Sequence, residues 1–574
     1  MNVSNGTISV GNGGALTDGN GFGQLIVSNA SLTTKGVLLG SSVGGHGIAN
    51  IQPGGAIHIP NAQQGCAACG FSSNEGDLDG GVIDSPGADL FLGQTHPGEF
   101  FVNSGSGVFS NVHVGFDNIG TVTGFGGSLQ ALGYISVGEQ SGATGFVWMS
   151  GGIVVATNND TNIGGNGYGH VAISNGTVVA SHEWVGTFAG SSGTLRLAGG
   201  TNIVQGYLEV GGYPNATGAV WMTSGQLATS GQFLIGDGGV GQMTVSNGIE
   251  LATDIFVGAG SEGTFTMAGG TNTVSSFFTL AGGFNATGTV WMTGGQLDVD
   301  QGITVGQYDA GRMMVSNGII HADREFVGLS LGSQGSLTLQ GGVDNVFTLM
   351  SIGASGCLSS TGVVNVTGGS LYVTNASVSA TLEVVSGTFT ASSGFVQLDK
   401  LVVTSACARV VHAGGTLLYN TLVLDPSLSA VGDGIPNGFK QQYGLDPFDP
   451  NLGSESFNDT GLTVIQAFQS GFAPKNNAAY PHVTGIGKVN ANDIKVIYLG
   501  ANGDSSYTPG IASRTNVLEF SPGTANGSYS NNFTSTGQTN ILSGGTGVGL
   551  ITNMIDAGGA TNPSRYYRIR VITP

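Results

Sequence analysis

Three tryptophans occupy the same place in a repeated sequence motif. Trp148, Trp221 and Trp291 each follow Gly-x-Val and precede Met, and they lie 73 and 70 residues apart. In the neighbouring repeat units the matching position carries Ala172, Arg196, Thr244, Thr266, Thr338 and one apolar residue, Met314. Because most of these residues are small or polar, we expect the position to face solvent. Aromatic rings in a row can stack on sugar rings, so the tryptophans are candidate glycan-binding residues; alternatively, a loop, a neighbouring module or a second copy covers them.

Carboxylates scattered through the repeats are the second set of residues that could do chemistry. Asp298 and Asp300 lie two apart on one expected strand, where they would form a same-face pair. Polysaccharide-cleaving sites need two or three converging carboxylates, or carboxylates with calcium and a basic residue. Arg and Lys are nearly absent from the repeats. We therefore expect a protein without catalytic residues, and a polysaccharide-cleaving β-helix enzyme is the alternative.

The tryptophan motif belongs to a repeat of 22 to 27 residues, grouped in threes. The opening glycine recurs at Gly169 and Gly193, at Gly241 and Gly263, and at Gly311 and Gly335. This period predicts a solenoid, in which only the stack of units has a core. We expect a right-handed parallel β-helix over residues 1–424, with roughly fifteen or more rungs of about 4.8 Å each. A β-propeller is the alternative, but its blades need longer strands.

Two short strands are expected in each unit. In Gly263–Gly270 the alternation places Phe265 and Met267 inside and Thr264 and Thr266 outside. A second signal, such as Phe256-Val-Gly258, ends in a glycine that permits the positive φ of a tight corner.

Composition restricts the partners. Of 574 residues, 105 are Gly and only 8% are charged, with a net charge of −20. Fourteen Lys and Arg form no basic stripe, which argues against nucleic acid as a partner. No apolar run approaches the ~20 residues that span a bilayer. Because Val3–Thr7 resembles Ile173–Thr177, we expect the chain to begin inside a repeat, with an export signal missing.

The four cysteines are too few for a disulfide scaffold. Cys66-Ala-Ala-Cys69 could be inert, a local disulfide, a redox pair, or half of a zinc site completed by a histidine. Cys357 and Cys407 fall about two rungs apart, or ~9–10 Å, beyond the ~7 Å limit of a disulfide. We expect them not to pair with each other.

Residues 53–97 interrupt the repeat rhythm. Four prolines and five acidic residues join the Cys66–Cys69 pair there. We expect an irregular inserted loop, either a solvated acidic segment or a calcium-binding one.

After residue 424 the composition changes. The stretch Gly432–Pro450 resembles the calcium-loop segments of secreted bacterial proteins related to the thrombospondin type 3 and dockerin loops. The resemblance implies two loops with calcium ligands Asp433, Asn437, Asn458 and Asp459, joined by short helices over residues 425–475. Lys440 stands where that pattern has an acidic ligand, so both loops look degenerate. We expect a helical hairpin with the core Phe439, Tyr443, Leu445, Val464, Ile465 and Phe468.

Strand patterns return from residue 476. The segments 493–498, 515–520 and 566–571 predict a small antiparallel β-sandwich. This ending looks like the C-terminal module of large exported bacterial repeat proteins, and the repeats resemble autotransporter-adhesin-like β-solenoids. The resemblance implies a structural or adhesive role at the bacterial surface or outside the cell. The implied partners are an extracellular polysaccharide, a cell-surface or matrix protein, or further copies joined through the solenoid ends; beyond calcium, no cofactor is implied.

Overall fold

The computed structural model describes residues 2–4, 7–9, 16–17, 22–34, 36–39, 46–59, 71–72, 75–354, 356–357, 360–524, 526–562 and 564–573. It is an all-β fold with 58% strand and 4% helix. The chain forms two compact units, Met1–Glu383 with Ser393–Lys400 and Thr416–Asn420, and Val384–Ser392 with Leu401–Gly415 and Thr421–Pro574.

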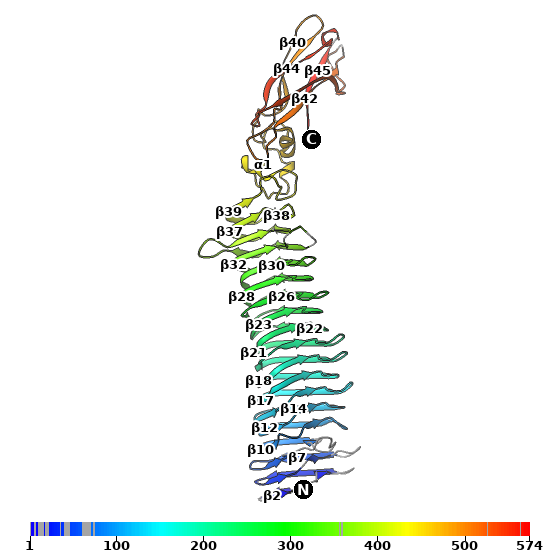
Figure 1. Cartoon of the computed structure of the whole chain (residues 1–574), viewed down its shortest axis with the longest axis vertical. Helices are drawn as coiled ribbons and strands as arrows, with labels where there is room; N and C mark the ends of the chain where they lie inside the picture. Colours follow the sequence, from blue (N-terminus) through cyan, green and yellow to red (C-terminus); the bar gives the residue numbers. More distant parts are fainter. Residues whose placement is uncertain are drawn as a thin grey trace. The chain divides into compact units, whose positions relative to one another are not determined.

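The repeats fold into a parallel β-solenoid of about 16 coils, or rungs, stacked as Figure 1 shows. Each opening glycine pairs with the opening glycine one rung later, as in Gly241, Gly263 and Gly288. This confirms the predicted parallel β-helix architecture.

The strands of the solenoid follow one another in chain order. The first nine are β1 (Asn2–Ser4), β2 (Thr7–Ser9), β3 (Leu16–Thr17), β4 (Phe22–Ser28), β5 (Ser31–Thr33), β6 (Val37–Leu38), β7 (His46–Ile51), β8 (Ala56–His58) and β9 (Phe71–Ser72). Next come β10 (Glu75–Ser85), β11 (Leu90–Leu92), β12 (Gly98–Phe109), β13 (Val112–Val114), β14 (Ile119–Gly124), β15 (Ser128–Ala131), β16 (Ile135–Val137), β17 (Thr144–Ile163), β18 (Tyr168–Val185), β19 (Ser192–Val204) and β20 (Leu208–Val210). The following ten are β21 (Thr217–Ile235), β22 (Val240–Val245), β23 (Ile249–Val257), β24 (Glu262–Met267), β25 (Thr271–Val274), β26 (Phe277–Leu280), β27 (Thr287–Met292), β28 (Gln296–Val305), β29 (Ala310–Val315) and β30 (Ile319–Val327). The last are β31 (Gln334–Leu339), β32 (Val343–Ile352), β33 (Thr361–Val366), β34 (Ser370–Val373), β35 (Thr381–Val384), β36 (Gly387–Ala391), β37 (Phe395–Val403), β38 (Ala408–His412) and β39 (Thr416–Leu424).

A complete rung contains three strand segments, one more than the sequence predicts. In one rung these segments are β24, β25 and β26, and elsewhere neighbouring segments run together into one longer strand. The prediction missed the middle segment because its inward residues are not all apolar. In β25, Val274 is buried beside the equally buried Asn272, so no apolar alternation marks the strand.

The inward side chains form ladders along the stack. Phe265 and Met267 are each 1% exposed, as predicted. Val290 and Met292 take the same places one rung later and are also buried. Stacking like side chains at one height gives a narrow apolar core that no single rung could bury.

The predicted irregular loop at 53–97 is wrong for the described parts of that range. β10 pairs in parallel with β7 and β8 on one side and with β12 on the other, so it is an ordinary rung. Its inward residues Leu78 and Ile83 are buried, whereas Asp79 and Asp84 point outward. The strand pattern was missed because its outward positions are acidic. The Cys66–Cys69 pair lies outside the described residues.

The other two cysteines take part in disulfide bonds. Cys357 and Cys407 are both disulfide-bonded. Each lies in an irregular connection rather than on a strand, and Cys357 has a positive φ of 57°. The distance derived from rung spacing therefore does not apply to them.

The helical hairpin lies in the second unit and is formed by α1 (Asn437–Gln442) and α2 (Val464–Ser470), with the 3-10 turn η1 (Leu452–Ser454). Thr463 caps α2 through a reciprocal capping box with Gln466, and Gly471 ends the helix with a φ of 74°. The buried cluster between the helices contains all six predicted core residues, as well as Ile435, Leu452, Tyr507 and Ile511.

Two three-stranded antiparallel sheets complete this unit. One orders β40 (His482–Lys488), β41 (Ile494–Gly500) and β44 (Leu550–Asp556); the other orders β43 (Thr534–Ser543), β42 (Ser513–Pro522) and β45 (Arg565–Ile572). The 3-10 turn η2 (Gly559–Thr561) precedes β45. Both sheets contribute to one buried cluster of Val496, Tyr498, Leu518, Met554 and Ile569. No helix in the described part of the chain is long and apolar enough to cross a membrane.

Candidate functional site

The three tryptophans lie in one register column on the outer side of the first strands. Strand pairing runs from Trp148 through Ala172 and Arg196 to Trp221, one rung at a time. It continues through two threonines to Trp291. The side chains are 45%, 48% and 38% exposed, respectively, so the predicted outward orientation is confirmed. Neighbouring tryptophans are three rungs apart, or about 14 Å.

A ladder of hydroxyl groups holds the strands that carry this column. Two residues beyond the column position, Ser or Thr side chains donate to a backbone carbonyl of the previous rung, on the residue that directly follows the column position there. Their oxygen–oxygen distances are 3.0 to 3.5 Å, and the donors are Ser150, Ser174, Thr223, Thr293, Ser316 and Thr367. These bonds fix adjacent rungs side by side and keep the column straight.

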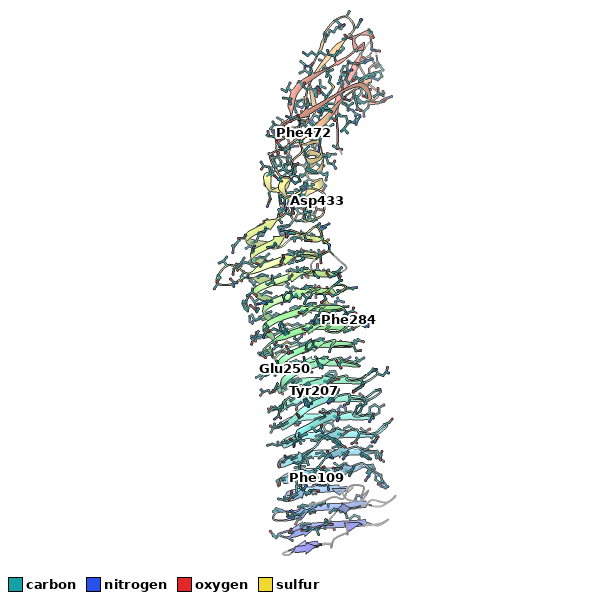
Figure 2. The ribbon with its side chains drawn as sticks, in the orientation of Figure 1. Phe109, Tyr207, Glu250, Phe284, Asp433 and Phe472 are labelled. Carbon is teal, nitrogen blue, oxygen red and sulfur yellow. The ribbon has the colours of Figure 1, made fainter. Side chains whose placement is uncertain are left out.

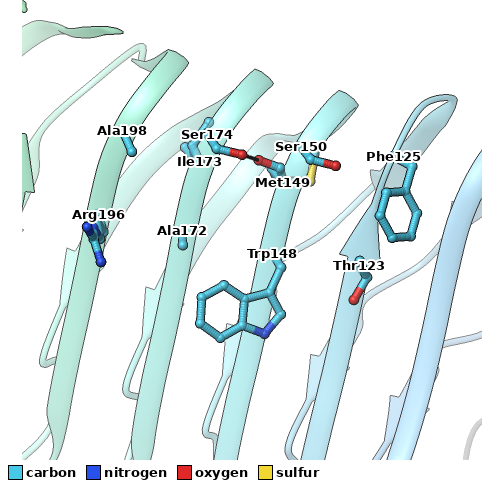
Figure 3. A pocket seen from close by; sticks show the side chains of 10 residues that line it. All are labelled: Thr123, Phe125, Trp148, Met149, Ser150, Ala172, Ile173, Ser174, Arg196 and Ala198. Atoms are coloured by element: carbon cyan, nitrogen blue, oxygen red, sulfur yellow. Dashed lines mark hydrogen bonds between the residues drawn. The ribbon is translucent and has the colours of Figure 1, made fainter. Parts of the chain in front are cut away.

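Trp148 has the most developed surroundings. Its ring lies nearly parallel to that of Phe146, with centroids 5.9 Å apart, and His170 continues the group at 6.4 Å. Figure 3 shows the indole lying toward Ala172, whose methyl group takes little room, with Arg196 beyond it. Trp148, Ala172 and Arg196 line a cavity of 310 Å³ together with Phe125. An aromatic floor with one cationic edge suits a partly apolar, hydroxyl-bearing ligand.

The two outward positions that Phe146 and Trp148 occupy in β17, taken in each first strand from β14 to β33, define a surface that we call the Trp face. A third outward position at the start of these strands, which carries Glu262 in β24, is not part of it. Along the Trp face, the described residues from Thr121 to Asn365 include two arginines and no carboxylate. Arg196 pairs with Trp221 across one rung. The guanidinium of Arg312 lies 5.5 Å from the ring centre of Trp291, within the range of a cation–π contact.

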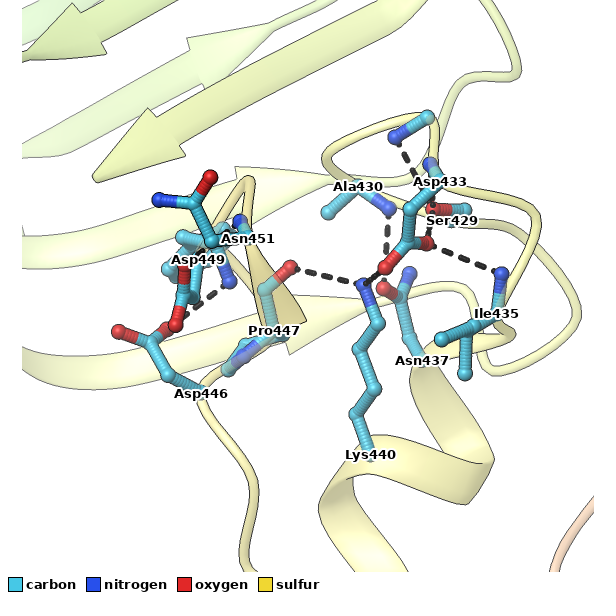
Figure 4. A network of polar contacts seen from close by, with 12 residues as sticks. Ser429, Ala430, Asp433, Ile435, Asn437, Lys440, Asp446, Pro447, Asp449 and Asn451 are labelled. Atoms are coloured by element: carbon cyan, nitrogen blue, oxygen red, sulfur yellow. Dashed lines mark hydrogen bonds and ion pairs between the residues drawn. The ribbon is translucent and has the colours of Figure 1, made fainter. Parts of the chain in front are cut away.

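Of the predicted calcium ligands, two lie at the start of the hairpin, where a lysine already supplies a positive charge. The ammonium of Lys440 is buried, 2.9 Å from a carboxylate oxygen of Asp433 and 3.4 Å from the carbonyl of Pro447 (Figure 4). Asn437 uses its side chain to accept from the amide of Ala430 and to donate to the carbonyl of Asp425. The first predicted loop is therefore tied together by its own side chains.

The other two predicted ligands bond elsewhere. Asn458 donates to the carbonyl of Pro474 at 3.0 Å, and Asp459 accepts from Asn477 at 3.2 Å. Within the described ranges, no group of three or more His, Cys, Asp or Glu side chains is arranged to hold a metal ion. Calcium binding stays a prediction.

Asp298 and Asp300 border a hollow on the second segment of a rung. The hollow measures 620 Å³, and Asp323 and His321 line it with them. Asp298 lies 2.8 Å from the Nδ1 of His321 and also accepts from Gln296. The structure thus brings the predicted carboxylate pair together with a third acid and a histidine that the sequence did not connect to it.

Two features escaped sequence reasoning. One is a group of carboxyls buried inside the solenoid: Glu183, Glu250, Glu325 and Asp344. The other is an outer surface on the third strand segments, where acids and aromatic rings alternate. The sequence does contain a signal for the buried carboxyls, because each one interrupts an otherwise largely apolar column of the repeat.

Comparison with protein-family models, with curated proteins and with solved structures gave no match. The functional argument therefore depends on the geometry of these surfaces.

Proposed function

We propose that this protein is an exported, non-catalytic structural and adhesive solenoid that binds an extracellular glycan through the Trp face. The observation that carries the proposal is the column of three exposed tryptophans at three-rung intervals on a surface without carboxylates. The exposed indole rings are in contact with solvent in the free protein, and covering them with sugar rings removes apolar surface from water, which favours binding.

The scaffold supports an adhesive role. Each rung is hydrogen-bonded to the next along parallel strands, so the tryptophans keep their spacing without a ligand. A preformed row of rings avoids the entropy of ordering a binding site. Low charge, abundant hydroxyl and amide side chains and the resemblance to exported bacterial repeat proteins favour the cell surface or the extracellular matrix. A cell-surface or matrix protein, or a second copy at a solenoid end, is the competing partner.

Binding to a panel of soluble and insoluble polysaccharides tests this function. The matched variant replaces Trp148, Trp221 and Trp291 with threonine. Threonine already occupies this column in other rungs, as Thr244 and Thr266. We expect the native chain to bind at least one polymer and the folded triple variant to lose about tenfold or more in affinity for it. Failure to bind any polymer, or equal binding by both proteins, contradicts the proposal. Sedimentation at increasing concentration separates self-association from ligand binding.

Polysaccharide cleavage at Asp298 is the second candidate function. The hollow lined by Asp298, Asp300, Asp323 and His321 supports it, because paired carboxylates can act as acid and base on a glycosidic bond. Release of shortened sugar chains from a polymer that the native protein binds, abolished by Asp298→Asn, would establish this activity. If the polymer stays intact after prolonged incubation, the protein binds it without cleaving it.

A further inference from the structure

The third strand segments carry a second distinctive surface. Its centre is a register column in which Asn162, Trp184, Glu209 and Leu234 follow one another, one rung apart. With residues from the adjoining corners they form a surface that we call the acid–aromatic face, consisting of Glu139, Asp160, Trp184, Glu209, Tyr213 and Asp237. This face belongs to different strand segments from the Trp face.

The aromatic side chains of this face contact one another across rungs. Trp184 stacks with Tyr213 at 24°, with ring centroids 6.3 Å apart, and meets Tyr207 edge-on at 5.5 Å. Phe188 lies 5.6 Å from Tyr213. Figure 2 marks Tyr207 in the stack. Rings braced in this way keep their positions without a ligand, which makes them a preformed platform.

Carboxylates surround these rings. A Cβ atom placed on Gly212 would lie 2.9 Å from Oε1 of Glu209 and 3.1 Å from the ring of Trp184, so carboxyl and indole border the same glycine. Glu209 also hydrogen-bonds with Asp237. Burial, together with the charge of Asp237, raises the pKa of Glu209 to about 8, and burial likewise raises the pKa of Asp237. The pair lacks a cation to balance its charge.

The chain supplies almost no positive charge to this region. Between residues 36 and 311 the only Lys or Arg is Arg196, which lies on the Trp face. The two remaining acids of the face have only histidine partners: Glu139 with His113 at 2.5 Å, and Asp160 with His182 at 3.4 Å. A net charge of −20 adds a long-range attraction for cations.

We propose that the acid–aromatic face binds a sugar chain that carries free amino groups. Sugar rings lie against Trp184 and Tyr213, and one ammonium group is held between Glu209 and Asp237. A neighbouring cavity of 240 Å³, lined by Glu139, Asp160 and polar residues, receives the next part of the chain. An ammonium beside the Glu209–Asp237 pair favours its ionised form and offsets the cost of burying it. This site is independent of the glycan site proposed on the Trp face.

Calorimetric titration with two ligands of equal length tests the proposal directly. One is an oligomer of glucosamine and the other an oligomer of N-acetylglucosamine, which share a backbone and differ in the ammonium group. We expect the glucosamine oligomer to bind about tenfold or more tightly, the gain typical of a charge-assisted hydrogen bond, and to weaken as salt is added. Equal affinity for the two oligomers overturns the proposal.

Two variants locate the site. Glu209→Leu introduces leucine, which occupies the same column one rung later as Leu234. Trp184→Asn introduces asparagine, which occupies the column one rung earlier as Asn162. Both should fold, and both should remove the preference for glucosamine. Trp221→Thr on the Trp face is the control and should keep that preference, which separates this site from the first proposal. A lysine oligomer that binds as tightly as the glucosamine oligomer contradicts recognition of a sugar.

Discussion

At the scale of single residues, Lys440 shows how one buried side chain ties a loop together. Its ammonium is fully buried beside Asp433. Burial lowers the pKa of Lys440, and the carboxylate of Asp433 opposes that shift. The pair also holds the start of the hairpin, because the same ammonium donates to the carbonyl of Pro447.

Lys440→Met should therefore destabilise the second unit. We expect a loss of about 3 kcal/mol or more, because removing one partner of a buried ion pair leaves the other charge uncompensated. Chemical denaturation followed by far-UV circular dichroism measures this loss in the free energy of unfolding. Lys495→Met, at an exposed strand position, is the control. Addition of calcium should restore part of the stability if Asp433 accepts a metal in place of the ammonium; unchanged stability of Lys440→Met contradicts the role given to the pair.

Glu250 is a second informative residue because it points into the apolar core. It is 0% exposed, and within the described part of the protein neither of its carboxyl oxygens has a hydrogen-bond partner. Burial raises its pKa well above the usual value. The same column carries Leu227 one rung earlier and Leu297 two rungs later.

Glu250→Leu should stabilise the solenoid, and more so as the pH rises. A carboxyl with a raised pKa contributes its full stability below its ordinary pKa, and this contribution is lost as the pH rises toward the folded value. The native chain and the variant should therefore diverge as the pH rises above about 4, the ordinary pKa of a glutamate. Thermal melting at several pH values measures this. Glu262→Gln, at an exposed position, should leave the pH profile unchanged, and a parallel shift at all pH values would refute the ionisation argument.

The outward tryptophans could be predicted from the sequence because many rungs can be compared at one position. The acid–aromatic face could not. In the third strand segments β13, β16 and β20 every residue is buried, including the outward His113 and Ser136. Without a contrast between buried and exposed neighbours, alternation carries no information about which side a residue faces.

At the scale of elements, the opening glycine of each rung is required by the close approach of backbone segments. A Cβ atom on Gly263 would lie 2.0 Å from the amide nitrogen of Gly258 and 2.3 Å from the carbonyl oxygen of Ile235. Gly241 is equally confined. Both are backbone contacts, so a side chain cannot be accommodated by rotating a neighbour. The sequence shows the period of these glycines but not this cause.

Gly263→Ala should therefore separate adjacent rungs and destabilise the solenoid by about 3 kcal/mol. The matched variant is Gly142→Ala, where φ is 85° and no atom lies within 4 Å of the added carbon. There only backbone strain applies, at a cost of about 1–2 kcal/mol. Hydrogen exchange of the flanking strands compares the two. Equal effects would show that the close approach relaxes at little cost.

At the scale of the whole molecule, the solenoid accumulates carboxyls that favour their protonated form. Burial raises the pKa of Glu183 to about 7 and, with Asp237, that of Glu209 to about 8. Burial raises the pKa of both Glu325 and Asp344, and the charge of Asp344 adds to the shift of Glu325. For Glu183 alone, the rise from its ordinary pKa to its folded pKa corresponds to about 3 kcal/mol of folding stability that is lost as the carboxyl ionises. The pKa of Asp89 is instead lowered, because its interactions with His113, Asn111 and Ser110 together outweigh burial.

The protein should thus be more stable in mild acid than in base. We expect the melting temperature to fall as the pH is raised from about 4 to about 8, since the stabilising protons are lost through this window. Differential scanning calorimetry measures the trend. A melting temperature that rises with pH over this range would mean that the acids with lowered pKa dominate.

The regular interval between the tryptophans has a consequence for the ligand as well as for the protein. On the function proposed for the Trp face, once one segment of a polymer is held, the next ring, about 14 Å away, meets the following segment at a high effective concentration. Avidity then rises in steps, each time a chain becomes long enough to reach one more tryptophan. Oligomers shorter than the interval engage only one ring and leave quickly. A protein with this function would distinguish polymers by their length, and adding or removing a three-rung block would change the longest chain it can distinguish without changing the spacing of the tryptophans.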